Sequence, residues 1–304
     1  MSSARVTATH RSLLYVRTEE GREMPARLGK RELSIVSGDL VRCEFDSQHD
    51  ELRVVAVEPR SNGLYRTNSR GGGELIAANL TQLLVVVAPL PRPDFFIVDR
   101  YLCAAHCGSI RPIVVLNKCE LPSPADLERE LAAFNTAGVH TLSVSAHGGT
   151  GLEALRALLS GQTSMLAGQS GVGKSSLLRA LLPGCDTPIG ELIRDDEGRH
   201  TTTATRLYAL PGGGDILDSP GVRDFAPAID RLDPAALGFA EIEALASQCR
   251  FADCRHLREP GCAIKSSVDA GLLSARRYES YRRLRRLCDR LRGDRPASAA
   301  RRQP

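Results

Sequence analysis

The pattern of hydrophobic and polar positions changes twice along the chain. Over the first 60 residues, short apolar runs alternate with turn residues such as Gly21, Gly29 and the sequence Ser37-Gly38-Asp39. The strands that we expect from these runs lie at 12–17, 24–28, 40–45 and 52–58. Several short strands at this spacing are typical of a small barrel, and the oligonucleotide-binding (OB) barrel is a common fold of this size. The pattern does not separate a barrel that binds RNA from one that docks on a protein.

From about residue 81, short apolar runs alternate with helical stretches. The expected strands lie at 83–88, 113–116, 141–144, 164–167, 205–210 and 215–217, and the expected helices at 95–106, 124–137, 150–160 and 175–182. This alternation is typical of a mainly parallel sheet covered by helices. After residue 230 the strand pattern stops and helix takes over.

These patterns predict a multi-domain α/β protein. The turn sequence Ser61-Asn62-Gly63 and the glycine run at 71–73 lead us to interpret residues 61–80 as a linker. The predicted segments are an OB-like barrel at 1–65, a linker at 66–80, an α/β domain at 81–230, and a helical domain with a basic tail at 231–304.

One loop in the α/β region carries a nucleotide motif. The segment GQSGVGKSS fits the phosphate-loop pattern and lies between an expected strand and an expected helix. Glycines let the backbone point its N–H groups at phosphate oxygens, and the following helix adds its positive end. Lys174 would reach the β- and γ-phosphates. The nucleotide-binding residues assigned to this loop are Gly168, Gln169, Ser170, Gly171, Val172, Gly173, Lys174, Ser175 and Ser176.

Two downstream segments suit the phosphate end of the nucleotide. Asp218 ends an expected strand and can hold the shell of a magnesium ion, while the N–H of Gly221 can sense a γ-phosphate. Between them and the phosphate loop, residues 198–203 read GRHTTT, and one threonine, taken here as Thr202, could close onto the ion as a switch loop does. We therefore expect Ser175, Thr202 and Asp218 to hold Mg²⁺. A plain threonine-rich loop is the alternative.

Residues that precede the phosphate loop suit the base. Asn117-Lys118-Cys119-Glu120 follows an expected strand, and an acidic side chain there can accept two hydrogen bonds from the guanine edge. Adenine has no matching donor pair, so this acceptor would discriminate against it. Asn117 and Lys118 would hold the loop in shape and cover the ring. Ser145 and Ala146, after the next strand, could place a backbone N–H on the base oxygen.

Together these motifs resemble the five boxes of translation-factor-type GTPases, but in a permuted order, because the base boxes come first. With a preceding barrel and a cysteine-rich tail, the chain resembles the circularly permuted ribosome small-subunit-dependent GTPase family (RsgA, also called YjeQ). The resemblance covers nearly the whole chain. It implies an OB-like barrel, a circularly permuted P-loop GTPase domain and a helical zinc-binding domain. It also implies hydrolysis of GTP to GDP, slow alone and stimulated by the small (30S) ribosomal subunit late in its maturation.

Two positions depart from the family pattern. The base box ends in Glu120 where the family usually has aspartate, which puts strict guanine selectivity in question. Val222 occupies the position where many GTPases place a water-orienting glutamine, and an apolar side chain cannot orient water. We hypothesise that His200, in a segment like the GHTT switch of the family, positions the attacking water, so that the catalytic residues are His200 and Lys174. An exposed loop histidine is the competing interpretation.

A second candidate site lies in the C-terminal region, where three cysteines and a histidine fall within fourteen residues: Cys249, Cys254, His256 and Cys262. Three thiolates and one imidazole form a closed tetrahedral shell, the usual form of structural zinc. The surrounding segment is too polar to bury itself well, so a metal would supply folding energy. The alternative is a loop with unpaired cysteines, and the family resemblance favours zinc.

A rival set, Cys103, His106 and Cys107, shares one predicted helix face. No fourth ligand is near in the sequence, so we interpret its cysteines as buried structural residues.

Composition limits the remaining classes. The chain has 304 residues and nine cysteines, no apolar run long enough for a bilayer and no visible secretory signal, which favours a reduced cytoplasmic setting without membrane contact. Residues 276–304 contain eleven arginines against three acidic residues, so a polyanion contact is plausible beside a plain solvated helix. The resemblance names the partners as the small ribosomal subunit with its rRNA, and GTP or GDP. We expect a monomer.

Two other classes of protein remain open. A metabolic P-loop kinase or ATPase would use the same phosphate loop but would not need the base boxes, so competition between GTP and ATP discriminates. An RNA-binding zinc protein would need only the barrel and the tail, and substitution of Lys174 would leave its behaviour unchanged.

Overall fold

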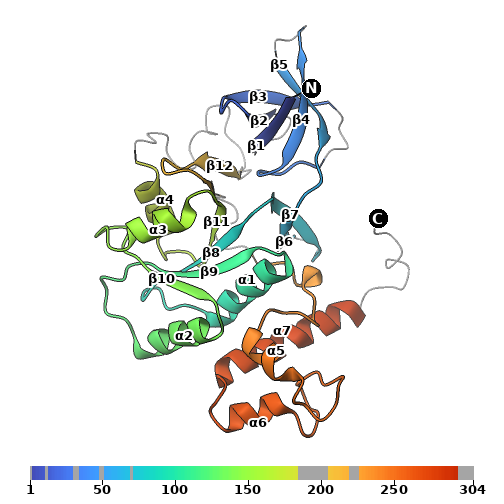
Figure 1. The fold of residues 1–304 in the computed structure, drawn as a ribbon, viewed down its shortest axis with the longest axis vertical. Coiled ribbons are helices and arrows are strands. Elements are labelled where there is room, and N and C mark those ends of the chain that lie inside the picture. The colour runs from blue at the N-terminus through green and yellow to red at the C-terminus, as the bar shows by residue number, and fades with distance from the viewer. Residues whose placement is uncertain are drawn as a thin grey trace.

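The computed structural model describes residues 2–10, 13–29, 34–47, 51–68, 71–183, 205–218 and 226–293 (Figure 1).

The N-terminal region forms a closed barrel of five strands. The barrel strands are β1 (Ser2–His10), β2 (Leu13–Thr18), β3 (Glu23–Leu28), β4 (Leu40–Asp46) and β5 (Glu51–Val57). β1 pairs with both β2 and β4, which closes the barrel around a small apolar core. The predicted barrel is confirmed.

The first strand is absent from the sequence prediction. Ala4, Val6 and Ala8 are its buried apolar residues. Alanine adds little to a hydrophobic alternation, so the period of two is weak in this segment.

A mainly parallel sheet forms the middle of the molecule. Its strands run in the order β10-β9-β8-β11-β13-β12, and only β12 is antiparallel to its neighbour. The strands are β8 (Gln82–Val87), β9 (Arg111–Leu116), β10 (His140–Ser143), β11 (Thr163–Ala167), β12 (Arg206–Ala209) and β13 (Asp215–Asp218). This order places the strand before the phosphate loop in the centre of the predicted α/β fold.

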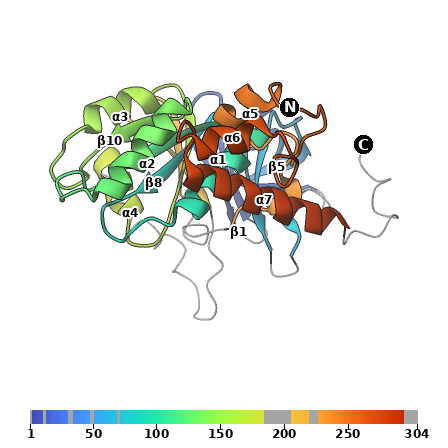
Figure 2. The ribbon, with the colours of Figure 1, turned by 90° about the horizontal axis from the view of Figure 1, so that it is seen from below.

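Helices cover both faces of this sheet. α1 (Phe95–Cys107) and α2 (Ala125–Thr136) pack into one apolar core through residues such as Tyr101 and Phe134. α3 (Leu152–Leu159) and α4 (Lys174–Leu181) pack into a second core on the opposite face, through residues such as Leu155 and Leu178. Figure 2 shows α1 and α2 beside the C-terminal helices.

The stretch interpreted as a linker contains a β-hairpin. β6 (Gly63–Thr67) pairs with β7 (Gly73–Ala78), and Leu64, Ile76 and Ala77 are buried in the core that α1 shares. Gly71 and Gly72 therefore belong to the hairpin turn, and Gly73 begins β7. The hairpin is part of the α/β core. Glycine runs serve turns and linkers alike, which is why the pattern misled.

The barrel and the central sheet are joined edge to edge. Ala8 of β1 pairs with Arg206 of β12, which makes one continuous sheet of eleven strands. Asp215 accepts from Arg5 at 3.0 Å and from Arg17 at 2.5 Å, so two barrel strands are tied to β13. The barrel is thus fixed to the sheet by both backbone and charge.

The C-terminal region is helical, as predicted. A 3₁₀ turn (Ile229–Arg231) leads to α5 (Ala240–Ala246), α6 (Ala263–Asp269) and α7 (Ala275–Gly293). Their apolar core also takes in Cys103 of α1, so α1 is shared between the two regions. Within the described residues, no helix combines the length and apolar character needed to cross a bilayer.

Candidate functional site

The predicted nucleotide motifs gather at one edge of the central sheet. β10, β9, β8, β11 and β13 are parallel, so their carboxyl ends lie together. Asn117 follows β9, Ser145 follows β10, Gly168 follows β11, and Asp218 ends β13. Ligands of open α/β sheets bind outside the carboxyl ends of the strands, so this edge is the expected place for a site.

Glycines allow the phosphate loop to approach its neighbours closely. Gly168 has φ +136°, and a β-carbon there would lie 2.2 Å from the Val86 carbonyl oxygen. Gly173 has φ +93°, and a β-carbon there would lie 2.3 Å from Nδ2 of Asn117. Only glycine satisfies both the left-handed backbone and this contact. The phosphate loop and the base loop therefore touch.

Side chains of the base loop lock the two loops together. Nδ2 of Asn117 donates to the Val172 carbonyl at 2.9 Å, and its Oδ1 accepts from the Ala146 N–H at 3.1 Å. Nζ of Lys118 donates to the carbonyls of Gly171 at 2.6 Å and Leu90 at 2.9 Å. Asn117 is 1% exposed. The base loop therefore lies beside the phosphate loop.

Glu120, the last residue of the base motif, is exposed. A hydrogen bond from the Ser145 side chain, with its own backbone N–H, lowers the pKa of the Glu120 carboxyl. The Ser145 oxygen also accepts from the Gly148 N–H at 2.7 Å. The Ser145 side chain, from the second predicted base motif, thus contacts the carboxylate of Glu120.

The lysine predicted to bind phosphates begins a helix. Lys174 is the first residue of α4 and is 8% exposed. Its ammonium donates to the carbonyls of Gly168 and Gln169, the latter at 2.7 Å. Leu217 of β13 pairs with Met165 of β11, so Asp218, one residue later, lies next to the strand that leads into the loop. Lysine, the Ser175 hydroxyl and a carboxylate are thus at one edge.

Several predicted residues fall outside the described part of the chain. These are Gly221 and the switch residues His200, Thr201, Thr202 and Thr203. Their roles stay predictions.

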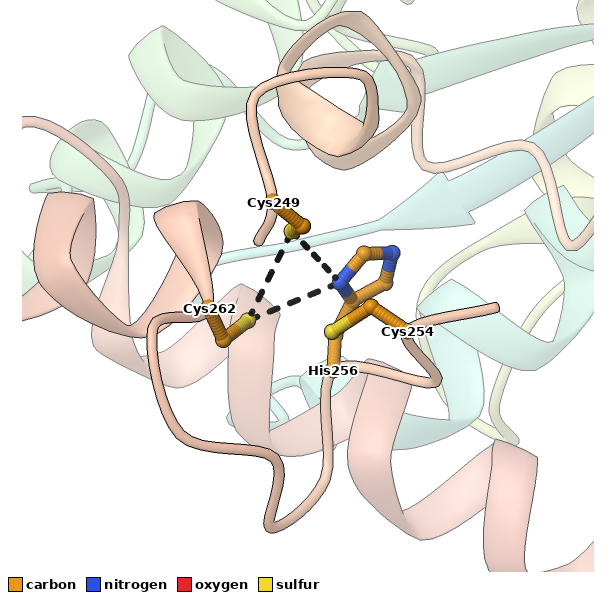
Figure 3. Close-up of side chains that lie close together, drawn as sticks. All are labelled: Cys249, Cys254, His256 and Cys262. Carbon is orange, nitrogen blue, oxygen red and sulfur yellow. Dashed lines mark hydrogen bonds between the residues drawn. The ribbon is translucent and has the colours of Figure 1, made fainter. Parts of the chain in front are cut away.

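The predicted metal ligands come together in the C-terminal region (Figure 3). Sγ of Cys249 and Sγ of Cys262 are 3.9 Å apart, and each lies 3.5 Å from Nδ1 of His256. The ligand atoms of these three residues and Cys254 all lie within 4.8 Å of one another. A tetrahedral centre with metal–sulfur bonds of about 2.3 Å and metal–nitrogen bonds of about 2.0–2.1 Å separates its sulfurs by about 3.8 Å and sulfur from nitrogen by about 3.6 Å. The cluster fits such a centre.

The Cys254 thiol of this cluster resists ionisation without a cation. Burial, followed by hydrogen bonding to Cys262 and Cys249, raises the pKa of the Cys254 thiol to about 12. Burial also lowers the pKa of His256, which favours the neutral imidazole that binds metals. A bound cation would reverse the thiol shift, because metal binding and thiol deprotonation are linked.

Sequence reasoning missed two residues that hold the cluster in place. Glu259 accepts hydrogen bonds from the backbone N–H groups of Arg255 at 3.2 Å and of Leu257 and Arg258 at 2.9 Å. Tyr278 of α7 donates to the His256 carbonyl at 2.8 Å. An acidic residue between two ligands of a polar loop was the available signal for Glu259, while Tyr278 lies in a distant helix and gave none.

The rival set does not form a site. The only cluster of potential ligands found across the described ranges is the one above. Cys103 is buried in the C-terminal core, and Sγ of Cys107 donates to the Ala236 carbonyl at 3.3 Å. The interpretation of these cysteines as structural agrees with their surroundings.

Known proteins share this arrangement. The model of the RsgA GTPase family matches residues 57–227. The small ribosomal subunit biogenesis GTPase RsgA of Ectopseudomonas mendocina is 44% identical over 255 residues, which cover 83% of this chain and 74% of that protein. The protein of the same name from Azotobacter vinelandii is 43% identical over 255 residues, with the same coverage.

Solved structures agree with these relatives. YjeQ from Thermotoga maritima superposes with a TM-score of 0.73 at 29% identity, over 94% of this chain and 98% of that one. YloQ, a circularly permuted GTPase, superposes with a TM-score of 0.71 at 24% identity, over 97% of this chain and 96% of that one, which bears on the fold alone. The chain belongs to the RsgA GTPase family, a family of GTP hydrolases.

Proposed function

We propose that the chain hydrolyses GTP to GDP during late biogenesis of the small (30S) ribosomal subunit, and that the subunit stimulates turnover and is then released. The observation that carries the proposal is the bridge made by Asn117, which joins the base loop to the phosphate loop at 2.9 Å. A site that recognises a purine and a triphosphate together needs these two loops in contact. Because the proposed partner is the ribosomal subunit, we place the activity of the chain in the cytoplasm. We also propose that the chain acts as a monomer.

The residues at this edge have separate roles. Lys174 and the backbone N–H groups of the phosphate loop hold the phosphates, and Glu120, with the Ala146 N–H, reads the guanine edge. Ser175, Thr202 and Asp218 would hold Mg²⁺, which neutralises charge on the phosphates when bound. His200 positions the attacking water, in place of the side chain that Val222 cannot supply. A His200→Ala variant with full turnover would remove this last role.

The metal that suits the C-terminal cluster is zinc. Three thiolates and one imidazole leave no ligand position open, and soft sulfur ligands favour zinc over magnesium or calcium. Its role is structural, because Cys249, Cys254, His256 and Cys262 come from loops with little apolar side chain to bury. Chelation should therefore loosen the helical region and leave the central sheet folded.

The surface beside the cluster suits an RNA backbone. A cavity of about 670 Å³ is lined by Arg255, Leu257, Arg258, Glu259, Arg286, Asp289 and Arg290. Both acids are engaged: Asp289 pairs with Arg255, and Glu259 accepts backbone N–H groups. The guanidinium groups of Arg258, Arg286 and Arg290 form no ion pair among the described residues, which leaves three cations for phosphate oxygens.

Three functional units follow from this division of roles. We propose the barrel and the zinc-bearing helices as the two sides that grip the subunit, with the GTPase domain between them. The hairpin of β6 and β7 belongs with the GTPase domain, because Leu64 is 1% exposed in its core.

Co-sedimentation with purified small subunits tests the proposed function. The chain should pellet with subunits when loaded with a non-hydrolysable GTP analogue and stay in the supernatant with GDP. A Lys174→Ala variant controls for nucleotide dependence and should lose the difference. Equal pelleting in both states, or a preference for an ATP analogue, would contradict the proposal.

A further inference from the structure

A buried ion cluster attaches the C-terminal helices to the GTPase domain. Asp99 of α1 is 0% exposed, and it accepts hydrogen bonds from Arg277 of α7 at 2.7 Å and from the adjacent Arg276. Arg277 is also buried, with its side chain 3% exposed. The contact joins positions 178 residues apart in the chain. In Figure 2, α7 runs beside α1 at this junction.

Each arginine is held on several sides. Arg277 donates to Glu241 of α5 at 2.7 Å, and its guanidinium lies 4.6 Å from the ring centre of Phe239 and 5.2 Å from that of Phe134. Arg276 forms an ion pair with Glu130 of α2 and lies over Phe95. Buried ion pairs add little to stability compared with apolar packing, but losing one partner is costly. Such a cluster therefore specifies one orientation of the helices it joins.

The N-terminal end of α1, five residues before Asp99, touches the phosphate loop. Asp94 caps α1 through its side chain, and its own backbone N–H donates to Oε1 of Gln169 at 2.9 Å. Pro91 lies against Gly171, 3.4 Å from where a β-carbon of that glycine would be. Lys118 donates to the Leu90 carbonyl in the same segment. The segment that begins α1 is thus held against the phosphate loop at two points and against the base loop at a third.

We propose that α1 is a strut that couples the phosphate loop to the zinc-bearing helices, and that Asp99 is the positioning residue that fixes their orientation. Asp94 and Asp99 are separated by five residues of one helix, or about 7.5 Å at a rise of about 1.5 Å per residue. A displacement of the phosphate loop therefore reaches α7 through one helical turn and one buried ion cluster. This route is separate from the chain segment at 222–233, which also connects the two regions. The inference rests on the proposed function only in naming GTP as the ligand.

Hydrogen exchange of α7 measures this coupling directly. In the wild-type chain, replacing GDP with a non-hydrolysable GTP analogue should change the exchange rates of α7 amides by at least about fivefold, the lower range of allosteric couplings. An Asp99→Asn variant should lose most of this difference while still binding the analogue. The matched control is Glu241→Gln, which removes a partner of Arg277 that lies wholly among the C-terminal helices and should keep the difference.

A second variant keeps the test decisive if Asp99→Asn fails to fold. Arg276→Gln leaves the Asp99–Arg277 pair in place and should reduce the difference in exchange. The coupling is overturned if wild-type α7 exchanges equally in both nucleotide states, or if the Asp99 and Arg276 variants respond like the control. Failure of the proposed function would look different, because the wild-type chain would then not bind the GTP analogue.

Discussion

Glu120 shows how one side chain departs from its family pattern and is accommodated. A hydrogen bond from the Ser145 side chain to the Glu120 carboxylate lowers the pKa of Glu120. With the proposed role of Glu120 as the guanine acceptor, we expect base selectivity in this chain to depend on both Glu120 and Ser145.

Replacing Glu120 with alanine should relax base choice. The loss of a charged acceptor should reduce the preference for GTP over ATP by about 10- to 100-fold, because hydrogen bonds to charged groups contribute about 1.5–3 kcal/mol. Competition binding with both nucleotides measures it. Ser145→Ala is the graded control, with a smaller loss, and an unchanged preference in Glu120→Ala would show that guanine is read elsewhere.

Glu259 is a single residue that organises the metal loop. Burial alone would raise its pKa, but backbone N–H groups of residues 255, 257, 258 and 259 outweigh this and lower the pKa of Glu259 to about 2, from an ordinary value of 4.5. Because the folded state lowers this pKa, the stabilisation is present above about pH 4.5 and is lost as the pH falls toward 2.

A Glu259→Gln variant should bind zinc about tenfold more weakly at neutral pH, since residues that support metal ligands typically have effects of this size. Competition with a chromophoric chelator measures the affinity. In the chelated proteins, the wild type should be more stable than the variant at pH 7, and this gap should narrow from pH 4.5 downward. Equal zinc affinities would remove Glu259 from the site.

The strands and helices of the central sheet were predictable because their signals are local. The run Leu83-Leu84-Val85-Val86-Val87 is apolar throughout, as a strand buried on both faces requires. The hairpin of β6 and β7 and the first barrel strand were not, because glycine turns and alanine-rich strands give weak patterns. Their assignment needed partners that only the folded chain supplies.

The hairpin makes a stability prediction that a linker would not. Leu64→Ala should lower the free energy of unfolding by about 2–5 kcal/mol, because it opens a cavity in a buried core. Leu90→Ala, at a site that is 63% exposed, is the control and should change stability by less than about 0.5 kcal/mol. Urea unfolding monitors both variants. A Leu64 variant as stable as its control would contradict the packing of β6.

The barrel, the central sheet and the C-terminal helices are joined by contacts that could not be predicted from the sequence. The base motifs, the phosphate loop and Asp218 could be predicted to lie together, because each follows or ends a strand whose carboxyl end lies at the same edge. The junctions between regions could not. Asp99 with Arg277, and Asp215 with Arg5, are charged residues far apart in the chain, and nothing in a charge pattern says which pairs will be buried.

The arginine-lined cavity leads to a prediction about how the chain binds the RNA of the small subunit. Replacing Arg258, Arg286 and Arg290 together with glutamine should weaken binding to small subunits and lower the slope of log affinity against log salt by roughly two to three, since each phosphate contact contributes about 0.7–0.9. Filter binding at several salt concentrations measures the slope. Arg129→Gln, on α2, is the matched control. An unchanged slope in the triple variant would place the RNA contact on another surface.

The central claim is that one site recognises both guanine and triphosphate and that the small ribosomal subunit stimulates its turnover. Steady-state turnover tests this claim most directly. GTP and ATP hydrolysis would be measured with the wild-type chain and with Lys174→Ala, each with and without purified small subunits. We predict turnover of GTP in strong preference to ATP, a rise when subunits are added, and loss of both in the Lys174 variant. Equal hydrolysis of the two nucleotides, unaffected by subunits, would contradict the account.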